Sequence, residues 1–313
     1  MLAYIVRRLL ATIPVMGVVA VFVFSLLYLT PGDPAVVIAG DFATAEDIAR
    51  IRERLGLNEP FLVRFGTWLW AVLRGDLGVS IFTNLPVTTL IGQRVEPTVA
   101  LTICTMLVSV ALAVPLGVIA AWRAGTLIDR VVMAFAVLGF SVPVFVLAYV
   151  LIFVFSLELE LLPVQGYTSI REGFWPFLER MILPSLALGI TFMALIARIT
   201  RASMLEVLSQ DYIRTAQAKG LDTGQVLVGH ALKNAAVPII TIIGIGVALV
   251  IGGVVVTETV FAIPGMGRLV VDAILRRDYP VIQGIILIFS AVYVLINLLV
   301  DISYTFLDPR IRY

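Results

Sequence analysis

Six stretches of the chain contain no charged side chain over a length that could cross a lipid bilayer. A spanning helix needs about 20 apolar residues, because each adds about 1.5 Å and the hydrocarbon is about 30 Å thick. Five stretches reach that length, and the fourth, with 17 residues, reaches it if the alkyl stem of Arg198 also lies in the hydrocarbon. In chain order they are Leu9–Leu29, Thr98–Trp122, Val131–Leu157, Met181–Ala197, Val237–Thr257 and Val281–Val300. The pattern predicts an all-α, polytopic membrane protein with six transmembrane helices.

The composition excludes several other classes of protein. Hydrophobic residues make up 60% of the chain and charged residues 14%, whereas soluble domains contain about 45–50% and about 25%. An ordinary soluble enzyme, a disordered chain and a disulfide-rich secreted domain are therefore excluded. A membrane β-barrel is disfavoured, because the apolar stretch at 101–121 does not alternate as barrel strands do. The net charge of +1 gives no bulk attraction to nucleic acid.

Motifs for catalysis and for metal binding are missing from the sequence. The chain has a single cysteine, Cys104, so an intrachain disulfide is impossible. It has a single histidine, His230, so a multi-histidine site is impossible as well. The sequence has no P-loop, no Gly-x-Ser-x-Gly elbow and no His-Glu-x-x-His motif. Acidic pairs are absent from the apolar stretches, which disfavours an intramembrane protease or a proton-coupled carrier. We therefore expect no catalytic residue, cofactor or metal in this chain.

Lys and Arg residues are distributed unequally between the connections predicted on one side of the membrane and those predicted on the other. The even-numbered connections and both tails carry 11 of them, and the two short odd-numbered connections carry five. Basic residues accumulate in cytoplasmic loops, so both termini are predicted to be cytoplasmic. The alternative that residues 1–29 form a cleaved signal peptide is disfavoured, because their apolar region exceeds about 7–15 residues and no small-x-small site follows.

The chain divides into three parts on this topology. Residues 1–30 are the N-terminal tail and first span, 31–97 form an external (periplasmic) insert, and 98–313 form a five-helix core. Within the insert, Thr44 and Asp47 have the spacing of a helix-capping box, Gly56 is a C-terminal stop, and a second helix is expected from about Pro60 to Arg74. The insert could be a packed cap, a docking surface for an external partner, or both.

The connection between the fourth and fifth spans is polar and amphipathic. We expect a short helix capped by Ser209 or Asp211 that ends at Gly220, and a second one capped by Asp222. One stripe of the first helix carries Tyr212, Thr215, Ala216 and Lys219. Such a stripe suits a helix docked in a partner's groove, and an amphipathic helix lying on lipid is the alternative.

The connection at 258–280 begins with a Pro/Gly turn, IPGMG at 263–267. Irregular backbone at membrane depth is tolerated only against protein or a wet cavity, so this turn is interpreted either as an outer gate or as part of a simple cap. Glu258 is expected at the outer membrane interface. Hydroxyls, prolines and glycines within the spans fit either a polar passage or ordinary helix packing. The candidate pathway or gate residues are Ser141, Pro143, Thr191, Glu258, Pro264 and Gly265.

Several short motifs follow one another along the whole chain. They include LTPGDP (29–34), LGLNEP (55–60), GDLGVS (75–80), RVEPT (94–98), DYIRTAQAKGL (211–221), HALKNAAVPIIT (230–241), GGVVVTETVFAIPGMGRL (252–269), RDYP (277–280) and DPRIR (308–312). In this order the motifs resemble the permease subunit of binding-protein-dependent ABC importers of the dipeptide, oligopeptide and nickel class, which includes glutathione importers.

This resemblance implies the type I ABC importer permease fold and a non-catalytic transport subunit of the bacterial cytoplasmic (inner) membrane. The implied partners are a second homologous permease, two ATPase subunits that bind ATP and Mg, an external solute-binding protein and the lipid bilayer, with no nucleic acid. The implied cargo is a dipeptide, an oligopeptide or glutathione. A nickel chelate or an oligosaccharide remains an alternative cargo, and a stand-alone secondary carrier an alternative mechanism.

The resemblance also implies that coupling helices at about 209–233 dock on the ATPase subunits. The residues implied in this coupling are Tyr212, Arg214, Thr215, Ala216, Lys219, Gly220 and His230. The broader importer pattern Glu-Ala-Ala-x-x-x-Gly matches only at Ala216 and Gly220, because its first two positions fall on Arg214 and Thr215. We therefore expect docking without the glutamate contact of the broader pattern.

Overall fold

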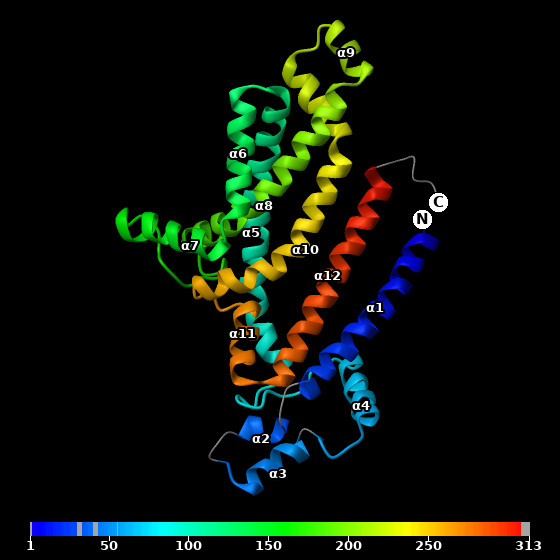
Figure 1. Ribbon diagram of the computed structural model, residues 1–313, viewed down its shortest axis with the longest axis vertical. Coiled ribbons are helices and arrows are strands. Elements are labelled where there is room, and N and C mark those ends of the chain that lie inside the picture. Colours follow the sequence, from blue (N-terminus) through cyan, green and yellow to red (C-terminus); the bar gives the residue numbers. More distant parts are fainter. Residues whose placement is uncertain (1, 30–32, 40–42, 55, 308–313) are drawn as a thin grey trace. The chain divides into compact units, whose positions relative to one another are not determined.

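The computed structural model describes residues 2–29, 33–39, 43–54 and 56–307 (Figure 1). Most of these residues are helical, and the β-pairing in this part of the chain is one isolated bridge between Val79 and Pro86. The α-helices are α1 (Leu2–Leu29), α2 (Pro34–Ala39), α3 (Ala45–Arg54), α4 (Phe61–Leu73), α5 (Val87–Trp122), α6 (Leu127–Ser141), α7 (Val144–Leu151), α8 (Phe174–Leu208), α9 (Asp211–Ala218), α10 (Ala236–Val260), α11 (Met266–Arg276) and α12 (Tyr279–Leu307). Two π-helices, η1 (Ile152–Glu158) and η2 (Gln225–Leu232), complete the set.

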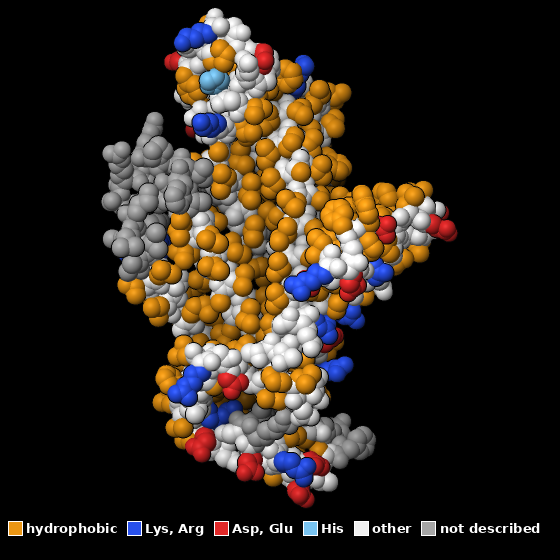
Figure 2. Space-filling view, turned by 180° about the vertical axis from the view of Figure 1, so that it is seen from behind, with side chains coloured by type: hydrophobic (Ala, Val, Ile, Leu, Met, Phe, Trp, Pro, Cys, Tyr) orange, Lys and Arg blue, Asp and Glu red, His pale blue; other side chains and the backbone are white. Residues whose placement is uncertain are grey.

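The all-α membrane fold predicted from the sequence is confirmed. Helices α1, α5, α8, α10 and α12 are each long and apolar enough to cross a membrane, and α6 with α7–η1 forms a sixth, bent span. Each of the six charge-free stretches coincides with one of these spans. Figure 2 shows hydrophobic side chains over most of the surface of the long helices, as expected where lipid replaces water.

The third predicted span differs from the expected single helix. It bends by 104° between Ser141 and Val144. Val142 has an extended backbone with φ −83° and ψ 126°, and Pro143 precedes the first residue of α7. Proline disfavours the helical conformation in the residue before it and has no N–H to donate. Pro143 thus breaks the span instead of merely kinking it.

The fourth span is longer than the sequence predicted. Helix α8 continues through Arg198 to Leu208, so Arg198 does not mark the end of the helix as expected. Of the residues in its most apolar window, 61% are buried, compared with 33% or less in the other four unbroken spans. Helix α8 packs on α6, α7 and α10, which makes it the central helix of its unit.

The chain forms two compact units. The first is centred on Val95–Arg268 and includes the end of α12 from Leu295, and the second consists of Val6–Arg94 with Leu269–Val294. The sequence-based division separates an external insert, 31–97, from a membrane core, 98–313. It concerns position relative to the membrane and stays a prediction.

The second unit contains an aromatic cluster between α1 and α4. Phe24 lies 5.2–5.5 Å, centroid to centroid, from the rings of Phe61, Phe65 and Trp68. The guanidinium of Arg64 lies 5.5 Å from the Phe24 ring centroid, a cation–π distance. Helix α4 matches the helix predicted from about residue 60 to 74.

Two local predictions for the second unit are also confirmed. The backbone N–H of Asp47 donates to Thr44 Oγ1 at 3.2 Å, and the N–H of Thr44 donates to Asp47 Oδ2 at 3.2 Å. This reciprocal pair is the predicted capping box, and the hydrogen bonds from Thr44 lower the pKa of Asp47. Gly56 has a φ of +62°, the left-handed conformation expected after a helix C-terminus.

Close packing of α5 on α8 depends on Gly117. A Cβ atom at this position would lie 2.6 Å from Thr200 Cβ and 2.8 Å from the carbonyl oxygen of Ala197. We expect Gly117→Ala to destabilise the protein by about 1–3 kcal/mol, the usual cost of overpacking. Thermal unfolding in detergent micelles measures this loss. Gly252→Ala is the matched control, because its Cβ would meet no atom within 4 Å; equal unfolding temperatures for the two variants would contradict the packing shown here.

Candidate functional site

The first candidate site is the coupling segment, defined as α9, η2 and the turn between them, which follows the end of α8 (Figure 1). The predicted stop at Gly220 is confirmed, since its φ is +79° and its N–H donates to the Gln217 carbonyl at 2.9 Å. Asp222 caps the next helix as predicted, by accepting the N–H of Gln225 at 2.7 Å. That helix is a π-helix, which the sequence did not indicate.

The predicted cap at the start of α9 is wrong. Gln210 occupies the N-cap position and makes no side-chain cap hydrogen bond. Ser209 Oγ instead donates backwards to the Glu206 carbonyl at 2.7 Å. The Asp211 carboxylate lies 3.5 Å from the guanidinium of Arg214, and both side chains are exposed to solvent.

The inner face of the coupling segment is anchored to the ends of three long helices. Ile213 and Ala216 of α9 are buried, with 1% and 9% of their surface exposed. They pack in one hydrophobic cluster with Val226 and Ala231 of η2, Ala121 of α5, Met204 of α8 and Ile239 of α10. These contacts place α9 against the ends of α5, α8 and α10 in one cluster.

The outer face of the segment is exposed. Tyr212 is 44% exposed, and the other exposed residues of the predicted coupling set are Arg214, Thr215, Lys219, Gly220 and His230. Ala216 is the exception because it is buried, and its predicted place on the docking stripe stays a prediction. Residues 213 and 216 share the inward face of α9 at i and i+3, so Ala216 supports the segment from inside.

A pocket of about 290 Å³ lies at the base of the coupling segment. Its lining includes Tyr212 of α9, Ser203 and Glu206 of α8, Asn234 between η2 and α10, and Pro238 in the first turn of α10. The amide of Asn234 donates to the carbonyl of His230 at 2.6 Å. The exposed face of α9 therefore borders a recess with polar groups.

The second candidate site surrounds Glu258 at the end of α10. This residue was expected at the membrane interface, but its side chain is fully buried. Thr98 Oγ1 donates to Glu258 Oε1 at 2.6 Å, and the N–H of Arg268 donates to Oε2 at 3.0 Å. Thr98 Oγ1 also accepts the N–H of Met266 at 2.8 Å. The carboxylate thereby fixes the start of α11, and α5 at Thr98, to the end of α10.

The IPGMG turn wraps closely around this carboxylate. A Cβ atom at Gly265 would clash with the Glu258 carboxylate, and one at Gly267 would lie 2.6 Å from Val255 Cα. Pro264 is half-buried beside them. Of the candidate gate residues, Glu258, Pro264 and Gly265 are thus brought together by the fold.

The neighbouring connection between η1 and α8 is fastened to α5. The hydroxyl of Tyr167 donates to Glu96 Oε1 at 3.0 Å, and Ser169 Oγ donates to the same oxygen. Burial of Tyr167, with the hydrogen bond to Glu96, raises the pKa of the phenol far above its usual value. The N–H of Gly166 in this connection donates to the Phe261 carbonyl at 2.9 Å, which ties it to the end of α10.

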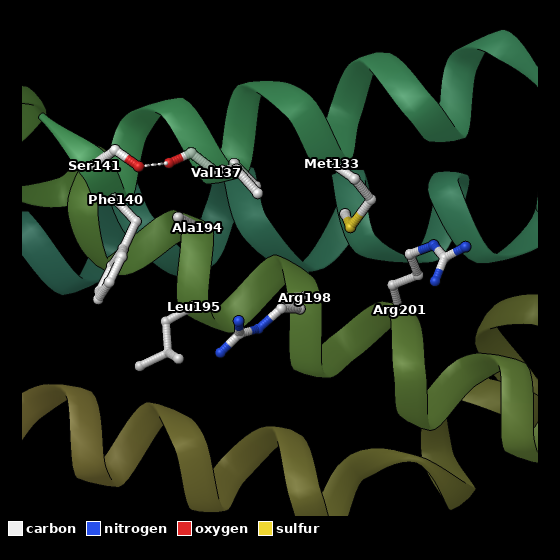
Figure 3. A pocket seen from close by; sticks show the side chains of 9 residues that line it. Met133, Val137, Phe140, Ser141, Ala194, Leu195, Arg198 and Arg201 are labelled. Atoms are coloured by element: carbon white, nitrogen blue, oxygen red, sulfur yellow. Dashed lines mark hydrogen bonds between the residues drawn. The ribbon is translucent and has the colours of Figure 1, made fainter.

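The remaining candidate pathway residues lie elsewhere. Ser141 and Pro143 flank the bend between α6 and α7, and Ser141 Oγ donates to the Val137 carbonyl at 2.8 Å. Thr191 lies on α8, and its buried hydroxyl has no hydrogen-bond partner among the described residues. Ser141 lines a pocket between α6 and α8 whose lining does not include Thr191 (Figure 3).

Sequence reasoning missed two elements of these sites. Thr98 was counted only as the first residue of a span, and nothing in the sequence indicated its pairing with Glu258. The ion pair between Asp129 and Arg201 was also missed; Arg201 Nε and Nη2 donate to the two carboxylate oxygens at 2.5 and 2.7 Å. This bidentate pair joins α6 to the part of α8 that lies beyond the predicted span. Among the described residues no cluster of three or more potential metal ligands occurs.

Comparison with known proteins identifies the family. Residues 113–313 match the family described as binding-protein-dependent transport system inner membrane component, and residues 1–102 match its N-terminal family. The chain is 57% identical over 99% of both lengths to a probable peptide ABC transporter permease protein, y4tP, of Sinorhizobium fredii. It is 42% identical to the dipeptide transport system permease protein DppB of Alkalihalophilus pseudofirmus and 45% identical to the glutathione transport system permease protein GsiC of Salmonella typhi, with full coverage of both chains in each comparison.

Among solved structures, the fold is similar to the inward-facing MetNI methionine ABC transporter. The TM-score is 0.59 at 18% identity, and the match covers 71% of this chain and 97% of the other. The likeness concerns the fold, which is that of a type I ABC importer permease. Since the first family match alone covers more than half of the sequence, this chain belongs to the family of inner membrane components of binding-protein-dependent transport systems.

Proposed function

We propose that this chain is the permease subunit of an ATP-driven importer of peptides and forms half of the translocation pathway. A second, homologous permease encloses the other half, two cytoplasmic ATPase subunits bind ATP and Mg, and an external solute-binding protein delivers the cargo. The names of the relatives support a peptide cargo, because they are described as peptide, dipeptide and glutathione permeases. The cargo of this chain is accordingly a dipeptide, an oligopeptide or glutathione.

The observation that carries this proposal is that α9 has one buried face and one exposed face. Its inner face, with Ile213 and Ala216, packs into a cluster that includes the ends of α5, α8 and α10, and its outer face is exposed. An ATPase that grips the outer face more tightly in one nucleotide state than in another shifts the spans toward one conformation, because a ligand shifts an equilibrium only through differential affinity. Catalysis resides in the partners, and this chain transmits their movement.

The proposed orientation of the chain in the membrane follows the distribution of basic residues. The coupling segment and both termini face the cytoplasm, and the IPGMG turn beside Glu258 lies at the outer face of the inner membrane. The orientation is supported by the 11 Lys and Arg residues of the cytoplasmic connections and tails, compared with five in the two short external connections.

Reconstitution tests the proposed function. Proteoliposomes that contain both permeases and both ATPases should accumulate a labelled dipeptide only with ATP and the solute-binding protein. Solute movement by the purified chain without an ATPase would contradict the importer and favour a stand-alone carrier. A ligand screen of the solute-binding protein tests the cargo separately, since exclusive binding of a nickel chelate or an oligosaccharide would overturn only the peptide assignment.

A further inference from the structure

A groove of about 380 Å³ runs between α6 and α8 (Figure 3). We call it the α6–α8 groove, and it is lined by Met133, Ala136, Val137, Phe140, Ser141, Ala194, Leu195, Arg198 and Arg201. Its walls along α6 extend from Met133 to Ser141, which corresponds to about 12 Å of helix at about 1.5 Å per residue. The groove is therefore elongated, and six of its nine lining residues are apolar.

The two arginines of the groove are in different electrostatic states. Arg201 is neutralised by its bidentate pair with Asp129. Arg198 is exposed, and no hydrogen bond or ion pair engages its side chain within the described part of the chain. In Figure 3 the Arg198 side chain extends along α8 toward Leu195. An uncompensated positive charge thus lies on the α8 wall of the groove, between Leu195 and Arg201.

The groove borders a surface that is suited to lipid. Val137 and Phe140 of α6 are 62% and 64% exposed, and Val131 and Phe135 on the same helix are 57% and 54% exposed. In a membrane such side chains face acyl chains. Arg198 lies at the end of the predicted apolar stretch of α8, where a long basic side chain can reach a phospholipid headgroup.

The lining distinguishes between ligand classes. Ser141 has the only neutral polar side chain of the lining, and its hydroxyl already donates to the Val137 carbonyl. A peptide in this groove would leave its own N–H and C=O groups without partners, at a cost of about 1–3 kcal/mol for each. An acyl chain has no such groups to satisfy. The unpaired Arg198 and the apolar walls match the anionic head and hydrocarbon tail of a phospholipid.

We propose that the α6–α8 groove is a binding site for one anionic phospholipid. Its phosphate lies on Arg198, and one acyl chain follows Leu195, Val137 and Phe140 along the groove. The lipid fills the space between α6 and α8.

Native mass spectrometry of the detergent-solubilised importer complex tests this site. The probes are dioleoyl phosphatidylglycerol and, as the matched neutral lipid, dioleoyl phosphatidylcholine. Arg198→Gln should weaken phosphatidylglycerol binding about fivefold, the effect of roughly one basic side chain near an anionic headgroup, and leave phosphatidylcholine binding unchanged. Arg198→Lys should restore most of the affinity. Arg123→Gln is the control, because Arg123 is an exposed arginine that stacks on Trp122 outside the groove.

A second variant tests the apolar part of the groove independently. Leu195→Trp fills the groove and should reduce the binding of both lipids. Unchanged phosphatidylglycerol binding in both Arg198→Gln and Leu195→Trp would overturn the proposal. It would equally be overturned if a photo-reactive residue at Leu195 formed adducts with the second permease instead of lipid, or if a peptide cargo displaced the phosphatidylglycerol.

Discussion

Replacing Gly220 by valine is expected to uncouple transport from ATP hydrolysis in the reconstituted importer. Gly220 has a φ of +79°, and a Cβ atom there would meet no atom within 4 Å. The effect of the substitution is therefore confined to the backbone, where a left-handed conformation costs about 1–2 kcal/mol for an ordinary side chain and more for a β-branched one. The turn between α9 and η2 would relax and change the angle at which α9 meets the ATPase. We expect dipeptide uptake to fall about tenfold, the factor that 1.4 kcal/mol produces, while ATP hydrolysis persists.

The control for this prediction is Gly220→Asn. Asparagine adopts the left-handed conformation more readily than other non-glycine residues, so uptake by this variant should stay close to that of the parent. Gly229→Ala is a second control, because Gly229 lies in η2 and an added Cβ would meet nothing within 4 Å. Full uptake by Gly220→Val would show that the turn does not set the coupling angle.

Replacing Glu258 by alanine is expected to destabilise the part of the first unit where α10 meets α11. The substitution removes the acceptor for Thr98 Oγ1, which is buried, and for the Arg268 N–H, which is partly buried. Each unsatisfied buried donor costs about 1–3 kcal/mol, and the vacated space adds to this loss. The thermal unfolding temperature of the purified complex should fall, and dipeptide uptake should fall with it.

Two further variants separate the role of the Glu258 carboxylate from loss of charge in general. Glu258→Gln keeps the shape but replaces one acceptor oxygen by a donor, so an intermediate unfolding temperature is expected. Glu179→Ala removes an exposed carboxylate of α8, for which a change within about 0.5 kcal/mol is usual. If Glu258→Ala unfolded at the same temperature as Glu179→Ala, the Glu258 carboxylate would not stabilise the IPGMG turn.

The sequence allowed the spans, the capping box at Thr44, the stop at Gly220 and the cap at Asp222 to be predicted. These features depend on local physics: hydrophobic length, backbone conformation and hydrogen bonds over a few residues. The 104° break at Pro143 was missed, because proline is also found in helices that merely bend. The extension of α8 to Leu208 was missed as well, since amphipathic sequence beyond a span continues or ends a helix according to what packs against it.

The site residues could be predicted only in part for a related reason. Tyr212, Lys219 and His230 are exposed as docking requires, but the inward orientation of Ala216 is set by a cluster drawn from four separate parts of the chain. The pairing of Thr98 with Glu258 joins residues 160 positions apart. No local pattern encodes such a contact, because it exists only once α5 and α10 are packed together.

Photo-crosslinking from the coupling segment tests the central claim most directly. A photo-reactive phenylalanine analogue is placed at Tyr212 in α9 or at Tyr149 in α7, two exposed tyrosines of the same unit. In the assembled importer, the Tyr212 position should form adducts with an ATPase subunit and their yield should change when ATP binds, whereas the Tyr149 position should form none with the ATPase. Adducts from Tyr212 to lipid alone, while the ATPase is bound elsewhere on the complex, would contradict the claim that force enters this permease through α9.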